Sequence, residues 1–358
     1  MADITASMVK ELREMTGAGM MDCKKALSET NGNMDEAVEV LRKSGAAKVE
    51  KKASRIAAEG IAKVAVDGNK AVVVEVNSET DFVAKNEVFQ EFVQNVANKA
   101  LTVDVDKAGD GEDVVAILDV KAELDEKTLK IGEKLSVRRF EKVLGDCVAT
   151  YIHGGGRIGV LVAGNGDSSD AAKEALTNIA MQIAAMNPQY ISRDEISKDE
   201  IDKLREITVD SAINDPASLP KPVLQGLIDK AVADKKWTDE DIAIYEDKKS
   251  NMNYLFNFLS KEAKDVLVQL GFDDKDAIVG NKIFAGLVEG RISKQLKEIT
   301  LLDQTYVKAE DGKQSVAQYL ASVNKGLVVT KFVRFEVGEG LEKKNEDFAA
   351  EVAAQMNA

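Results

Sequence analysis

The feature that most constrains the fold of this chain is an internal repeat. Two strand-like segments joined by a glycine-containing turn, an amphipathic helix and a single alternating strand occur twice in the same order. The two closing strands match locally, with VRRFE at residues 137–141 and FVRFE at residues 332–336. Such self-similarity predicts two similar structural units. Because each unit mixes paired strands with a helix, the expected fold class is α+β.

The first repeat unit is expected over residues 56–145. Strand-like residues 61–66 and 71–76 flank Asp67-Gly68-Asn69, a pattern typical of a β-hairpin. A strand closes the unit at residues 135–143. The intervening helix carries its apolar residues on one face: Phe89, Phe92, Val93, Val96 and Ala100.

The second repeat unit is expected over residues 146–191 and 301–342. Its hairpin turns at residues 153–157, and its closing strand is expected at residues 328–337. The helix between them carries Leu176, Ile179, Ala180 and Ile183 on one face. It should end near Asn187, because the residue before a proline is disfavoured in helical conformation.

A mostly helical insertion, residues 192–300, splits the second repeat unit. Three of the four prolines of the chain fall at positions 216, 220 and 222. Apolar stripes at residues 223–232 and 283–296 need cover, and five of the aromatic residues between them crowd together: Trp237, Tyr245, Tyr254, Phe256 and Phe258. The stripes can pack on each other with these aromatics, or on a second copy of the chain. The sequence leaves both a monomer and a homodimer through the insertion open.

The ends of the chain are expected to be helical. Residues 1–55 predict a three-helix docking module whose third helix stops near Gly45, with a solvated connector at residues 47–55. Residues 343–358 predict a short C-terminal helical module.

Composition excludes several classes of function. The chain has 48 basic and 62 acidic residues, a net charge of −14, which argues against a direct grip on nucleic acid. One histidine cannot form a histidine metal cluster, and two distant cysteines fit a reducing cytosol without a disulfide framework. No run of 18 apolar residues exists, so we expect a cytoplasmic protein without a membrane span. No set of residues indicates an enzyme, a metal or a bound cofactor.

One glycine-rich segment matches a nucleotide-binding pattern. Residues 154–159 (GGGRIG) fit the pattern GxGxxG, whose dinucleotide-binding form needs a helix directly after the glycines. Here a strand-like segment follows, so the glycines are better explained as a hairpin turn. The alternative hypothesis, that the chain is a nucleotide-dependent enzyme, would rest on this match. The neighbouring His153 has no nearby serine or cysteine nucleophile in the sequence, and we interpret it as a surface or interface residue.

Two segments are candidates for binding a partner. In the first, residues 78–83 (SETDFV), Thr80 or Asp81 could cap the following helix and Phe82 could staple it to the core. Alternatively, an acid and an aromatic at a loop tip form a wedge, because an exposed Phe is a good anchor in a partner's pocket. In the second, Met20 and Met21 cannot both face a small core, and an exposed methionine suits an adaptable docking surface.

These segments carry a family resemblance. Residues 16–27 (TGAGMMDCKKAL) closely resemble the N-terminal signature of bacterial elongation factor Ts, and residues 75–77 (EVN) with 80–85 (TDFVAK) resemble its central signature. Residues 153–154 with 157–162, residues 334–340 (RFEVGEG) and residues 347–353 resemble later segments of the family. The resemblance covers about residues 1–195 and 285–358, with several motifs in the family's order. The insertion looks enlarged beside shorter members.

The resemblance implies a function. The family promotes guanine-nucleotide exchange on elongation factor Tu during translation, without covalent chemistry. It implies a ubiquitin-associated-like N-terminal module and a core of two similar subdomains. It also implies that Asp81 and Phe82, in the segment Thr80–Val83, disturb the magnesium and phosphate site of the GTPase. Docking contacts are implied for Leu12, Met20, Met21 and His153. A plain interaction scaffold that uses only the N-terminal module is the alternative to exchange.

Overall fold

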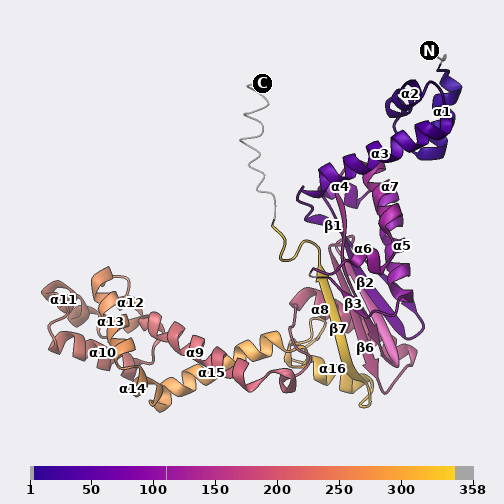
Figure 1. Ribbon diagram of the computed structural model, residues 1–358. Helices are drawn as coiled ribbons and strands as arrows, with labels where there is room; N and C mark the ends of the chain where they lie inside the picture. The colour runs from indigo at the N-terminus through magenta and orange to yellow at the C-terminus, as the bar shows by residue number, and fades with distance from the viewer. Residues whose placement is uncertain (1–3, 110, 343–358) are drawn as a thin grey trace. The chain divides into compact units, whose positions relative to one another are not determined.

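The structure, a computed structural model, describes residues 4–109 and 111–342 (Figure 1). The chain divides into two compact units. One runs up to Asn187 and resumes at Tyr306, and the other spans Pro188–Thr305. The C-terminal helical module expected over residues 343–358 lies outside the described residues. None of the helices in the described part of the chain is long and apolar enough to cross a membrane.

The first unit contains two antiparallel sheets that realise the repeat (Figure 1). In each sheet a hairpin is followed by a helix, and a closing strand then pairs with the second strand of the hairpin. The strand orders are β1-β2-β4-β3 and β5-β6-β7. The expected α+β fold class is therefore confirmed. The strands are β1 (Glu59–Asp67), β2 (Lys70–Ser78), β3 (Lys107–Ala108), β4 (Leu135–Leu144), β5 (Cys147–His153), β6 (Ile158–Asn165) and β7 (Val328–Glu336).

The helices of this unit lie before and between these strands (Figure 1). Helix α8 ends at Met186, as the following proline predicts, and Asn187 caps it in a left-handed conformation. The helices are α1 (Ala6–Thr16), α2 (Met20–Glu29), α3 (Met34–Ala53), α4 (Asp81–Ala84), α5 (Glu87–Thr102), α6 (Val114–Ile117), α7 (Lys121–Ile131), α8 (Asp170–Met186) and α16 (Val316–Val323).

Both faces of the first sheet are buried, which the alternation along β2 explains. Val72, Val74 and Val76 pack into the cluster that includes Phe89 and Phe92 of α5. The intervening Ala71 and Val73 pack instead into a cluster with Leu161 of β6 and Val333 of β7. A strand buried on both faces should be continuously apolar. The buried Glu75 and Asn77 break that rule, and they lie next to the candidate site described below.

The third helix of the N-terminal module is longer than expected. It continues through Gly45 to Ala53, so residues 47–53 are helical and not a connector. A single Gly costs a helix only about 1 kcal/mol, and the Ala, Lys and Glu residues that follow favour helix. A Cβ at Gly45 would lie 2.9 Å from Cδ1 of Leu129 in α7. The glycine therefore lets α3 approach α7 closely.

The second unit is helical and has its own core. Tyr190 and Thr300 form a parallel bridge, and the amide of Leu301 donates to the carbonyl of Tyr190 at 2.8 Å, so the two ends of the insertion meet. The unit contains α9 (Lys198–Asn214), α10 (Lys221–Ala233), α11 (Asp239–Lys248), α12 (Met252–Leu255), α13 (Lys261–Asp273), α14 (Lys275–Val279), α15 (Lys282–Ile299) and the 3-10 turns η1 (Arg193–Glu195), η2 (Pro216–Ser218) and η3 (Leu301–Asp303).

The apolar stripes of this unit are buried within the unit itself, in a cluster shared with α9 and α13. Leu224, Leu227 and Ile228 of α10 share one buried cluster with Phe284 and Val288 of α15. Burying these stripes does not require a second copy of the chain.

The expected aromatic cluster forms only in part. Trp237 and Tyr245 are buried in edge-to-face contact, with ring centroids 6.3 Å apart. Tyr254 and Phe258 are exposed, and Lys248 lies 4.9 Å from the Phe258 ring centroid.

Candidate functional site

The strand–helix junction after β2 presents Phe82 to solvent. Phe82 is 77 % exposed, whereas the next residue, Val83, is 8 % exposed and packs into the core around α5. Successive residues of a helical turn point about 100° apart, so α4 can expose one and bury the other. The staple reading of Phe82 is wrong, because the side chain is not buried. The inclusion of Val83 among the partner-binding residues is also corrected, because Val83 faces the core and anchors the turn.

The charged neighbours of Phe82 leave its ring accessible. Asp81 is exposed and accepts a 3.4 Å hydrogen bond from Lys85 one turn later. The ammonium of Lys85 lies 6.0 Å from the centroid of the Phe82 ring, at the outer limit of a cation–π contact. The tip therefore offers an aromatic ring beside an acid.

Thr80 has a different role from the cap that the sequence suggested. It is the N-cap residue of α4, but its side chain makes no capping hydrogen bond. Its hydroxyl instead donates to the carboxylate of Glu133, which precedes β4. Glu133 was missed by the sequence reasoning because one acid among 62 acidic side chains carries no local signal.

A cavity of about 320 Å³ opens beside the tip. Its walls come from both halves of the repeat: α4, α5 and β1 on one side, and the turn between β5 and β6 on the other. The structure thus brings Asp81 and that turn together. The lining residues are Glu59, Gly60, Ile61, Asp81, Ala84, Lys85, Gln90, Gly154, Gly155, Arg157 and Val337.

The glycine turn at this cavity is structural, as its sequence context predicted. Gly154, Gly155 and Gly156 all have positive φ, and strand β6 follows where a dinucleotide site would need a helix. The carbonyl of Gly156 accepts a 2.7 Å hydrogen bond from the amide of Ala62 in β1. A Cβ at Gly156 would lie 2.9 Å from that of Ile61. The turn therefore packs tightly on the first sheet.

His153 is exposed at the start of that turn and does not line the cavity. Its Nδ1 lies 3.1 Å from the hydroxyl of Tyr151. The chain's two cysteines, Cys23 and Cys147, are both buried free thiols, and burial raises the pKa of the Cys147 thiol. No group of acidic, histidine or cysteine side chains in residues 4–109 and 111–342 could hold a metal ion.

A buried ionic cluster lies under the site. The carboxylate of Glu75 is fully buried and accepts hydrogen bonds from Arg138 at 3.0 Å and from Arg139 at 2.5 Å. The amide of Asn77 donates to Glu75 and to the carbonyl of Glu59, a residue of the cavity wall. The cluster therefore ties β2 to both neighbouring strands, β1 and β4, just before the exposed junction.

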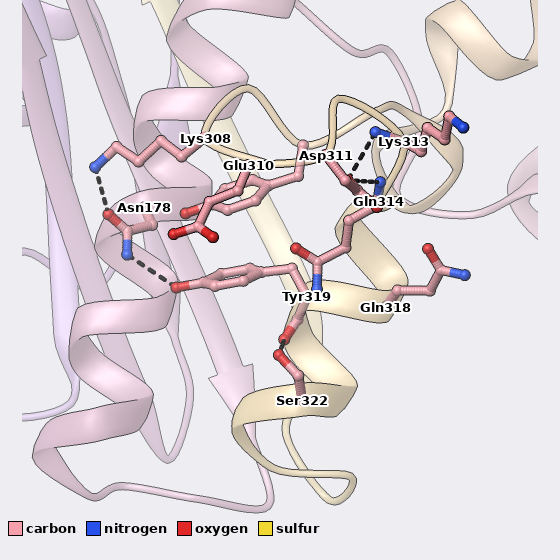
Figure 2. Close-up of a pocket in the computed structure, with 10 residues that line it drawn as sticks. Asn178, Lys308, Glu310, Asp311, Lys313, Gln314, Gln318, Tyr319 and Ser322 are labelled. Carbon is pink, nitrogen blue, oxygen red and sulfur yellow. Dashed lines mark hydrogen bonds between the residues drawn. The ribbon is translucent and has the colours of Figure 1, made fainter.

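A second cavity, of about 770 Å³, lies between α8, the segment before α16 and α16 itself (Figure 2). Tyr306 and Tyr319 stack there with ring centroids 4.0 Å apart. Burial and the Tyr319 hydroxyl raise the pKa of Tyr306. Lys308 donates to Asn178, and Asn178 donates to Tyr319, so these polar groups satisfy one another. None of the candidate site residues lines this cavity.

In the N-terminal module, exposure separates the candidate docking residues. Met20 and Met21, at the start of α2, are 60 % and 76 % exposed. Leu12 is 0 % exposed and packs in the module core against α2 and α3 residues such as Leu27 and Ala37. Leu12 is therefore corrected from a docking contact to a core residue that supports the module.

Comparison with known proteins gives a family match and curated relatives. The family model described as Elongation factor TS matches residues 79–339, which include the exposed junction, the insertion and β7. A curated relative, Elongation factor Ts of Clostridioides difficile (strain 630), is 42 % identical over 370 residues, which cover 99 % of this chain and 100 % of the relative. The enlargement of the insertion relative to other members stays a prediction. The family model spans well over half of the chain and the relative spans almost all of it, and the chain belongs to the elongation factor Ts family of translation elongation factors.

Proposed function

We propose that this chain is a guanine-nucleotide exchange factor that binds elongation factor Tu–GDP and promotes GDP release. The single observation that carries the proposal is Phe82, a large apolar side chain held 77 % exposed beside Asp81 at an ordered junction. Exposing such a ring to water is unfavourable, which favours burial of the ring in a partner. The family membership supplies the identity of that partner.

The mechanism is thermodynamic linkage. A protein that binds the nucleotide-free GTPase more tightly than the GDP form must weaken GDP binding by the same factor. A thousandfold effect needs about 4 kcal/mol of differential binding. In the proposed complex, Asp81 and Phe82 enter near the magnesium and phosphate groups. A carboxylate placed there repels the negatively charged phosphates that hold the magnesium ion.

The other candidate residues give the complex a second contact. Met20 and Met21 form a flexible apolar surface on α2 for docking the GTPase, and His153 contacts the partner from the second core subdomain. The chain itself makes no covalent change to nucleotide, binds neither GDP nor magnesium, and works in the cytoplasm, where translation takes place. Nucleic acid is not a direct partner. Because the insertion covers its own apolar stripes, we favour a monomer over a homodimer.

The test is release of a fluorescent GDP analogue from preloaded elongation factor Tu. A small molar fraction of this chain should accelerate release of the analogue when excess unlabelled GDP is added. Equilibrium dialysis of the chain alone with GDP should show no binding. Release that stays at its spontaneous rate across the concentration range would contradict the proposal.

A further inference from the structure

Glu133 holds the residue directly before the exposed tip. Its carboxylate accepts two hydrogen bonds from Thr80, one from the backbone amide at 3.0 Å and one from the hydroxyl at 2.7 Å. Hydrogen bonds to an ionised acceptor are about twice as strong as neutral ones. The two residues are 53 positions apart, so this contact exists only in the folded chain.

Thr80 is fixed at all of its polar groups. Its carbonyl accepts a 3.0 Å hydrogen bond from the hydroxyl of Ser78, in addition to the two bonds that Thr80 donates. Its backbone is extended, with φ −128° and ψ 157°, which sets the direction in which α4 starts. The conformation of the residue before Asp81 and Phe82 is thus set by side chains outside the helix that carries them.

The neighbouring residue is held in the same way. Glu79 accepts a 2.6 Å hydrogen bond from the amide of Lys134, and it pairs with Arg55 just beyond α3 at 3.1 Å. The ammonium of Lys134 donates to the carbonyl of Arg55 at 2.7 Å. We call Glu79, Thr80, Glu133 and Lys134 the junction clasp. It joins the end of β2 to the segment between α7 and β4.

The exposed ring cannot position itself. Phe82 is largely free of core packing, so its direction depends on the backbone of residues 80–83, which is held by the clasp on one side and by buried Val83 on the other. Ordering a free backbone costs about 1–2 kcal/mol per residue, and a preformed tip avoids that cost during binding.

We infer that Glu133 is a positioning residue for nucleotide exchange, acting through Thr80 to hold Phe82 in its exposed orientation. This inference rests on the proposed function. It predicts that Glu133→Ala slows GDP release at saturating exchange factor by about tenfold, which corresponds to the loss of charge-assisted hydrogen bonds. Thr80→Ser keeps the hydroxyl and the amide and should retain most activity.

A first test uses the free chain. Hydrogen–deuterium exchange of the peptide that spans residues 78–84 should be faster in Glu133→Ala than in the unaltered chain, because the Thr80 amide loses its acceptor. The matched control is Glu126→Ala, which removes an acid of the same charge from the exposed face of α7, where it pairs only with its neighbour Lys127 among the interactions of the described residues. That control should change neither hydrogen exchange of this peptide nor GDP release. Unchanged protection in Glu133→Ala would overturn the inference.

A second test separates positioning from a general structural role. Glu133→Ala is combined with Phe82→Ala, at concentrations where Phe82→Ala still gives measurable release. If Glu133 acts through the ring, its removal has no further effect on release in that background. An equal effect in both backgrounds, or full activity of Glu133→Ala, would overturn the inference. Failure of the unaltered chain to accelerate release would instead overturn the proposed function, while the hydrogen-exchange result would stand.

Discussion

The amide nitrogen of Gly338 donates a 2.8 Å hydrogen bond to the carboxylate of Glu75, although 263 residues separate them in the chain. Gly338 has φ +75°, and a Cβ there would lie 2.2 Å from the carbonyl oxygen of Ala58. Only glycine lets the backbone approach both groups. The segment after β7 is thereby tied to the strand that ends at the exposed junction.

Glu75→Gln should destabilise the first unit by about 3–5 kcal/mol, because Arg138 and Arg139 would remain largely buried without their carboxylate. Calorimetry should show a lower transition temperature for this unit. Fluorescence of Trp237, the chain's one tryptophan, reports on the second unit and should not change. The control Glu14→Gln removes an exposed ion pair with Lys10 and should cost no more than about 0.5 kcal/mol. Equal transition temperatures in both variants would contradict the prediction.

Phe82→Ala should slow catalysed GDP release by more than about tenfold and leave the melting temperature within about 1 °C, because the ring packs on little. Phe89→Ala is the matched control. Phe89 is fully buried on α5, so its loss should cost about 3–5 kcal/mol of stability. Exchange rates and melting curves are measured on both variants. A large loss of stability with normal exchange in Phe82→Ala would remove Phe82 from the site.

Replacing Met20 and Met21 together by Ala should raise the concentration of chain needed for half-maximal exchange by about tenfold, with little change in the maximal rate. Both side chains are exposed, so the module should stay folded. Leu12→Ala should behave differently, since its side chain is fully buried and its loss costs about 2–5 kcal/mol. A titration that gives the same half-maximal concentration for the double variant and the unaltered chain would exclude this surface from docking.

The insertion should fold alone and be dispensable for exchange. A fragment of residues 188–305 should unfold cooperatively by Trp237 fluorescence, because Trp237 is buried in this unit and donates to the carbonyl of Ala263 at 3.0 Å. The complementary variant replaces residues 192–298 by a short Gly/Ser linker between the paired ends at Tyr190 and Thr300. It removes both apolar stripes together and should keep most exchange activity. A folded variant that cannot release GDP would place the insertion in the functional interface.

Acid should destabilise the second unit through Asp241. Its carboxylate is buried, which raises its pKa, but hydrogen bonds from the Ser260 amide and from the Thr238 and Ser260 hydroxyls outweigh burial and hold the pKa below its usual range. A lowered folded-state pKa adds stability that is present above the unfolded pKa of about 4 and is lost as the pH falls through the folded pKa. Urea midpoints read from Trp237 fluorescence should therefore drop below about pH 4.

Two variants check the assignment to Asp241. Asp241→Asn should lower the midpoint at neutral pH and flatten its acid dependence. Asp239→Asn, two residues earlier on the exposed side of α11, should keep the profile of the unaltered chain. An unaltered acid profile in Asp241→Asn would assign the effect to other carboxylates.

The local pattern of the sequence was sufficient for most of the architecture. The hairpin around Gly68 and the apolar face that holds Phe89 and Phe92 are encoded by period-two and period-3.6 spacing. Gly45 shows where local patterns fail. The glycine predicted the end of a helix, but α3 continues through it, and the missing side chain makes room for Leu129 of α7.

The sequence alone was enough to recognise the repeated hairpin, helix and strand and the motifs of the family, because each of these is encoded by residues close together in the chain. The exposure of Phe82, the burial of Val83 and Leu12, and the hydrogen bonds between Glu133 and Thr80 emerge only in the folded chain. Periodicity states which residues share a face, but not what that face meets. A partner 53 or 263 residues away leaves no local trace, because chain folding alone brings the two groups together.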